Sequence, residues 1–172
     1  MFAIPDPLHP AIVHLPIALA VLIPGLALLA VFAIRAGLVP VRSWAALIVL
    51  NALLIGSSWL AIETGEDQEE KVERVVAERN IEDHEEAAER FLIVAIVAGL
   101  VSGTGLLAGR SGEIGRGATL VASALVLAAG IAVGHSGGEL VYRHGAASAY
   151  TSQQAPSPPR TAQKGTRSHD DD

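Results

Sequence analysis

The chain has 172 residues, of which 51% are hydrophobic and only 4% aromatic, and its formal net charge at pH 7 is -6. Its length favours one domain, and its mean hydropathy of +0.43 is high for a soluble protein of average composition. There is no basic stripe, which argues against nucleic acid as a partner. The absence of cysteine excludes disulfides, thiolate zinc sites and iron–sulfur ligation within the chain.

The first predicted membrane span covers residues 11–34, in which His14 is the only polar side chain. At about 1.5 Å per residue this helix would be about 36 Å long, enough to cross a hydrocarbon core of about 30 Å. No basic residue precedes it, and the apolar run is too long for a signal peptide, so we expect a retained span. A second span is predicted over residues 44–62. Trp44 and Trp59 lie near its ends, as is typical of residues at the membrane interface.

An acidic segment, residues 63–90, separates the second and third spans and contains twelve Asp or Glu and four Lys or Arg, so it must lie in water. Within it, Asn80 is the predicted N-cap of a helix that continues through the third span, residues 91–108. Residues 109–117 are predicted to form a short loop, and residues 118–135 the fourth span, which Ser136 and the two following glycines should end. Residues 146–172 are rich in Ser, Pro and polar residues, so we expect a disordered polar tail behind a membrane domain of residues 1–145.

The predicted fold is all-α: a polytopic membrane protein with a bundle of four transmembrane helices and an acidic helical insert between spans 2 and 3. Its first partner is therefore the lipid bilayer. Gly99-x-x-x-Gly103 lies in the third span and Gly130-x-x-x-Gly134 in the fourth. Membrane helices approach one another closely at such motifs, so these faces are candidates for homo-oligomerisation.

The basic residues near the first span indicate the orientation. Arg35 and Arg42 follow this span, no Lys or Arg precedes it, and cytoplasmic loops are enriched in basic residues. We therefore expect a multi-pass protein of the cell (inner) membrane with both termini on the non-cytoplasmic side. The same topology brings Glu63 and five histidines from four helices to that side; the histidines are His9, His14, His84, His135 and His144.

These histidines are the candidate ligands of a cofactor. Neutral imidazole is the commonest metal ligand, and helical bundles build such sites from side chains on facing helices. Two of His14, His84 and His135 are candidates to bind a haem iron, which makes haem b the first cofactor to consider. Alternatively, the same three imidazoles with Glu63 would bind a transition metal ion. The secondary candidates are the two remaining histidines, His9 and His144.

The stretches that open and close the membrane region form a pattern found in a known family. Residues 9–19 read HPAIVHLPIAL and residues 137–145 read GGELVYRHG, with Thr64-Gly65 after span 2 and His84 before span 3. Over about residues 5–147 the chain resembles a bacterial family of four-span membrane proteins catalogued as domain of unknown function 2231. It departs from the family pattern at Leu15, where an aromatic residue is usual, and in its longer acidic insert. Some relatives are fused to electron-transfer domains of Rieske or cytochrome type, so the resemblance implies a redox setting, haem b and a redox partner protein.

Three functional hypotheses remain open from the sequence. The first is a cytochrome-like electron-transfer protein with a histidine-lined haem site at the non-cytoplasmic end of the bundle. The second is a non-haem metal-binding membrane protein, and the third is a structural or assembly subunit that binds no cofactor. An enzyme is less favoured, because the sequence contains no Ser/His/Asp set, phosphate-binding loop or activated nucleophile.

Overall fold

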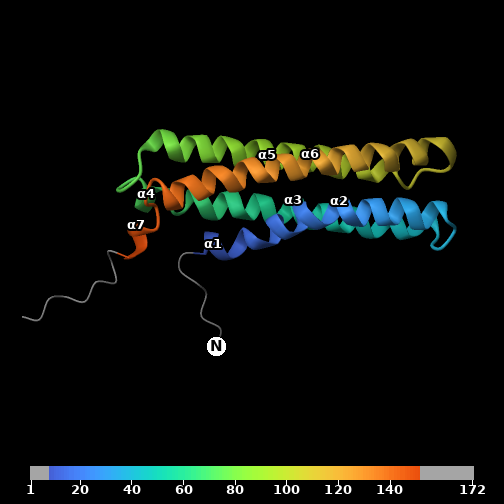
Figure 1. Cartoon of the computed structure of the whole chain (residues 1–172), viewed down its shortest axis with the longest axis horizontal. Coiled ribbons are helices and arrows are strands. Elements are labelled where there is room, and N and C mark those ends of the chain that lie inside the picture. Colours follow the sequence, from blue (N-terminus) through green and yellow to red (C-terminus); the bar gives the residue numbers. More distant parts are fainter. Residues whose placement is uncertain (1–7, 152–172) are drawn as a thin grey trace, which may run out of the picture.

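The computed structural model describes residues 8–151. Residues 1–7 and the part of the predicted tail from residue 152 onward lie outside the described residues. Four long helices lie side by side in an elongated bundle (Figure 1): α2 (His14–Arg35), α3 (Ala45–Glu66), α5 (Glu78–Thr104) and α6 (Gly109–Tyr142). Four short elements flank them: α1 (His9–Ile12), η1 (Val41–Trp44), α4 (Glu69–Val72) and α7 (Ser148–Thr151). No strand occurs between residues 8 and 151, and the predicted all-α fold is confirmed.

Four segments of this fold are long and apolar enough to cross a bilayer, among the residues described: His9–Arg35, Val41–Glu66, Glu78–Thr104 and Gly109–Tyr142. Large hydrophobic side chains lie exposed on the outer surface of each long helix, as at Leu29, Leu53, Leu100 and Leu125. So extensive an apolar surface is unfavourable in water and favourable against lipid chains. The structure therefore describes an integral membrane protein with four spans.

The four long helices pack in the cyclic order α2, α3, α5, α6, and α6 also contacts α2. The central core joins all four, with Ile23, Leu54, Phe91 and Val126 among its buried residues. Because aromatic residues are few, small residues provide much of the close helix–helix contact.

One glycine of each Gly-x-x-x-Gly motif packs inside this bundle. A side-chain carbon added at Gly99 would lie 2.9 Å from Cδ1 of Ile55, and one added at Gly130 would lie 3.3 Å from a ring carbon of Phe91. Gly103 and Gly134 face open space. Homo-oligomerisation stays a prediction, and in each motif only the exposed glycine, Gly103 or Gly134, would be available for contact with a second copy.

Trp44 differs from its expected place at the lipid interface. Its side chain is fully buried, and its indole Nε1–H donates a hydrogen bond of 2.9 Å to the carbonyl oxygen of Ser102. Gly105 lies directly against the indole, where a larger residue would collide with the ring. Trp44 thus joins the start of α3 to the end of α5, whereas Trp59 is exposed as expected.

The connection between α5 and α6 is shorter than predicted. α5 ends at Thr104 and α6 begins at Gly109, so residues 105–108 form the loop and residues 109–117 are all helical. Two of the glycines that suggested a loop are contact points instead, because a side chain on Gly112 would collide with Leu107 and one on Gly115 with Thr104. Arg116, which is buried, donates a hydrogen bond of 2.6 Å to the carbonyl oxygen of Gly105 and holds the two helices together.

Two helix boundaries also differ from expectation, the start of α5 and the end of α6. α5 begins after Ala77, without a side-chain cap, rather than after Asn80. α6 continues through Gly137 and Gly138 to Tyr142, because Gly137 packs against α5. At the start of the predicted polar tail, Ala146 is buried and Ser148 begins the short helix α7.

Candidate functional site

A cavity of about 520 Å³ lies at the end of the bundle where α1, α4 and α7 gather (Figure 1, left). His9 on α1 and His84 on α5 both line it. Its walls are largely apolar, with Ile62, Val72, Ile81, Leu140 and Val141 among the lining residues. Its charged lining residues are all acidic: Glu66, Glu69, Glu85 and Glu89.

His9 lies on the short helix α1, which is separated from α2 at Val13. Pro16 contributes to this break, because proline has no N–H to donate to the carbonyl of Ile12 and its ring crowds that carbonyl. The imidazole Nδ1 of His9 lies 2.8 Å from the carbonyl oxygen of Ala61. A carbonyl can only accept, so Nδ1 carries the proton and, in the neutral ring, Nε2 has the free lone pair.

Thr64 and Gly65 provide the surface on which the His9 ring rests. The hydroxyl of Thr64 lies 3.4 Å from Nδ1 of His9. A side-chain carbon added at Gly65 would lie 3.3 Å from Cε1 of His9, closer than an ordinary van der Waals contact. The Thr-Gly pair after span 2 therefore has a role that the family pattern did not reveal: it lets α1 and its histidine approach α3.

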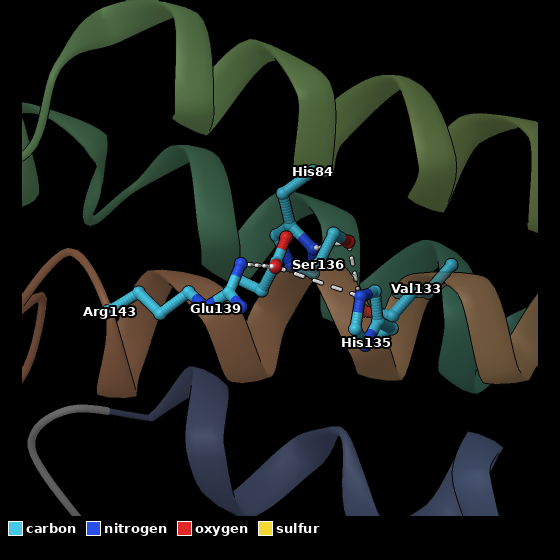
Figure 2. A network of polar contacts seen from close by, with 6 residues as sticks. All are labelled: His84, Val133, His135, Ser136, Glu139 and Arg143. Atoms are coloured by element: carbon cyan, nitrogen blue, oxygen red, sulfur yellow. Dashed lines mark hydrogen bonds and ion pairs between the residues drawn. The ribbon is translucent and has the colours of Figure 1, made fainter.

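His84 is held in place by α6. Its Nδ1 lies 2.8 Å from the hydroxyl oxygen of Ser136, as Figure 2 shows. That hydroxyl donates its single proton to the carbonyl oxygen of Val133, at 3.0 Å. With that proton given to Val133, Ser136 accepts from His84, an arrangement that places the proton of this ring on Nδ1 and its lone pair on Nε2. Gly137 makes room for the ring, because an added side-chain carbon would lie 3.1 Å from Cε1 of His84.

The first part of α5, residues 78–90, contains eight charged residues, so it projects beyond the apolar part of the helix into water. There, burial and the neighbouring His9 imidazole both lower the pKa of His84. The ring is therefore neutral at neutral pH and keeps its lone pair. Burial, followed by repulsion from Glu69, Glu66, Glu89 and Glu82, raises the pKa of the adjacent Glu85.

The other predicted site residues lie outside this cavity. His14 and Glu63 are exposed. The side chain of His135 is 77% exposed and lies 3.7 Å from Glu139 on the same helix, which also pairs with Arg143 (Figure 2). Like these residues, His144 is exposed, and its Nδ1 accepts a weak hydrogen bond from the side-chain amide of Asn80 at 3.4 Å.

The structure thus separates the three principal candidates and brings a secondary one into the site. His84 lines the cavity together with His9, whereas His14 and His135 lie on the outer surface. Among residues 8–151, no group of three or more His, Asp or Glu is placed to hold a metal ion. The pairing of His9 with His84 therefore replaces a three-histidine cluster as the feature to explain.

Sequence reasoning missed the residues that position the two imidazoles: Ser136, Gly65 and Gly137. A signal for them was present, because all three lie next to or within the short motifs of the family pattern. The signal was misread, since a Ser-Gly-Gly run ordinarily indicates the end of a helix rather than a contact between helices.

The membrane character of the chain agrees with its family relationship. A family model described as "Predicted membrane protein (DUF2231)" matches residues 5–149, which include both histidine motifs and the whole bundle. Neither the curated proteins nor the solved structures include one with significant similarity to the chain. Because the match covers most of the sequence and the structure has four candidate spans, the resemblance expected from the motifs is confirmed: the chain belongs to the DUF2231 family of predicted membrane proteins.

Proposed function

We propose that this integral membrane protein binds haem b in the cavity between His9 and His84 and transfers electrons at that end of the bundle. The observation that carries the proposal is the matched state of the two imidazoles. Each Nδ1 donates to a fixed acceptor, Ala61 O for His9 and Ser136 Oγ for His84, and each Nε2 is left with a lone pair. Metal-binding histidines have this arrangement, in which a second hydrogen bond fixes the tautomer and the ring orientation.

A pair of imidazoles fits haem better than it fits a bare metal ion. The porphyrin supplies most ligands of a haem iron, so the protein supplies only axial ligands. A protein zinc site, in contrast, takes about three or four protein ligands. Since the described residues place no group of three His, Asp or Glu around one point, the pair favours haem over the transition metal alternative.

The shape and lining of the cavity also support haem. Its volume of about 520 Å³ lies within the range of about 300 to 1,000 Å³ that is common for small-molecule and cofactor sites. Apolar side chains such as Ile81 and Leu140 would pack against the porphyrin and keep water from the two Nε2 atoms. When bound, haem supplies a one-electron redox couple.

The acidic lining of the cavity indicates a low reduction potential for the proposed haem. Oxidised iron carries one more positive charge than reduced iron, so nearby carboxylates stabilise the oxidised form and lower the reduction potential. Glu85 and Glu89 follow His84 on α5, and Glu66 and Glu69 face them from α3 and α4. The lining includes no Lys or Arg among the described residues, so the cavity offers no cationic partner to the haem propionates.

The proposal extends to orientation. Arg35, Arg42, Arg110 and Arg116 lie in or beside the two loops at the opposite end of the bundle. Because cytoplasmic loops are enriched in basic residues, we place that end in the cytoplasm and the histidine cavity on the non-cytoplasmic side of the cell membrane. A redox partner protein would then meet the acidic end of the bundle.

The test is a reduced-minus-oxidised absorption spectrum of protein purified in detergent from haem-replete cells, with a haem assay for stoichiometry. We expect a b-type spectrum that is lost in His9→Ala and in His84→Ala. Matched controls are His14→Ala and His135→Ala, which remove exposed imidazoles from the same end of the bundle and should keep the haem.

Three results would overturn the proposal. The first is a colourless protein with no Soret band after titration with haemin. The second is haem loss in the two control variants but not in His9→Ala or His84→Ala. The third, from elemental analysis, is stoichiometric zinc, copper, iron or manganese without haem, which would instead establish the non-haem alternative.

A further inference from the structure

A second cavity, of about 760 Å³, lies at the opposite end of the bundle, where the α2–η1 and α5–α6 loops come together (Figure 1, right). Three arginines line it: Arg35 at the end of α2, Arg42 in η1 and Arg116 in α6. Glu113 is the only acidic residue among its lining residues. The cavity therefore has an excess of positive charge.

Arg116 is the unusual member of this group. Its side chain is buried, with the residue 8% exposed, and its Nη1 donates to the carbonyl oxygen of Gly105 at 2.6 Å. In the part of the chain that the structure describes, neither Arg116 nor Arg35 nor Arg42 forms an ion pair. A buried charge without a counter-ion is costly, and a guanidinium has further N–H donors to offer. Arg116 therefore has guanidinium donors with which it could hold an anion.

The surroundings of the three arginines indicate where that anion comes from. The same cavity is lined by apolar residues, including Ile34, Val41 and Leu107. Leu107 is itself 51% exposed. The cavity thus lies where the apolar spans end and the loops begin, which is the level of lipid headgroups in a bilayer. Basic pockets between membrane helices are suited to anionic headgroups at this level.

We propose that this cavity binds the phosphate group of an anionic phospholipid, with Arg116 as the buried anchor and Arg35 and Arg42 as the outer contacts. Arginine suits this role, because its planar guanidinium matches the geometry of phosphate oxygens. The acyl chains would lie along the exposed apolar surface of the neighbouring spans. This site is independent of the histidine cavity, from which the length of the bundle separates it (Figure 1).

The test uses the full-length protein in nanodiscs made from equal amounts of phosphatidylglycerol and phosphatidylcholine with the same acyl chains. Native mass spectrometry then measures which lipid stays bound after release from the disc. We expect phosphatidylglycerol to be enriched. Arg42→Gln and Arg35→Gln should each reduce the enrichment by a factor of about ten, since a hydrogen bond to a charged group contributes about 1.5 kcal/mol.

Arg110→Gln is the matched control, because it removes the same charge at the same end of the bundle, beside the α5–α6 loop, from a residue that does not line the cavity. Its enrichment should stay within a factor of about two of the wild-type value. Equal retention of the two lipids by the wild-type protein would overturn the proposal, as would an equal effect of the control and Arg42→Gln. A parallel thermal-unfolding series in zwitterionic detergent compares short-chain phosphatidylglycerol with inorganic phosphate. Equal stabilisation by inorganic phosphate would show that the site takes a free anion and would overturn the assignment to a lipid.

Discussion

Gly137 and Gly138 provide a sharp test of the histidine site, because they are neighbours on α6 with opposite surroundings. A side-chain carbon at Gly137 would lie 3.1 Å from Cε1, 3.6 Å from Nδ1 and 3.7 Å from Nε2 of His84. At Gly138 the same carbon would meet nothing within 4 Å. Both substitutions to alanine add a residue with a helix propensity better than that of glycine by about 1 kcal/mol. Any difference between them therefore reports the contact with His84.

The expected magnitude follows from the displacement of the ring. To relieve the contact, the His84 ring must move by a few tenths of an ångström, which lengthens its hydrogen bond of 2.8 Å to Ser136 or tilts Nε2 away from the cavity. A neutral hydrogen bond contributes about 0.5 to 1.5 kcal/mol, so lengthening it without removing its partner weakens haem binding by at most about tenfold. We expect Gly137→Ala to show this loss and Gly138→Ala to bind haem as the wild type does.

The assay is titration of the apo-protein in detergent with haemin, followed at the Soret band. A measurement that does not depend on haem is the ¹⁵N NMR spectrum of histidine-labelled apo-protein, in which Gly137→Ala should shift the His84 ring nitrogens and leave those of His135 unchanged. Equal haem affinity of the two variants, together with unchanged His84 signals, would refute the packing argument.

Two other predictions follow from single contacts. Ser136→Ala removes the acceptor that fixes the His84 tautomer, and loss of such a partner typically weakens metal binding about 10- to 100-fold. The rate of haem transfer from the variant to apomyoglobin would measure this loss, and a rate equal to that of the wild type would contradict the prediction. Gly105→Ala would force a side chain into the indole of Trp44 and should lower the free energy of unfolding by about 1 to 3 kcal/mol. Gly103→Ala, which faces open space, is its control in thermal unfolding, and equal melting temperatures of these two variants would contradict the prediction.

The number of spans and the fold class were determined by the sequence itself. In hydrocarbon a backbone polar group has no water to bind, so a long apolar run that crosses a bilayer must satisfy its hydrogen bonds internally, as a helix does. Residues 11–34 and residues 44–62 are runs of this kind, and both proved to be helical apart from the break at Val13. The charged residues of the acidic segment likewise had to lie beyond the apolar part of the bundle.

The helix ends depended on contacts that the sequence could not reveal. Gly115 and Gly137 were both interpreted as residues that break helices, yet both lie inside α6. Glycine disfavours a helix by about 1 kcal/mol, and close packing against a neighbouring helix outweighs that preference. The atoms that face a glycine, here Thr104 and His84, come from a different segment of the chain.

The choice of histidines was decided by the tertiary structure alone. The topology brought His9, His14, His84 and His135 to the same end of the bundle, but it did not determine the direction in which each side chain points. That direction depends on the rotation of each helix about its axis and on the break between α1 and α2. Rotation is set by packing over the whole length of a helix, and a short motif contains little of that information. His9 and His84 therefore share a cavity, whereas His14 and His135 lie on the outer surface.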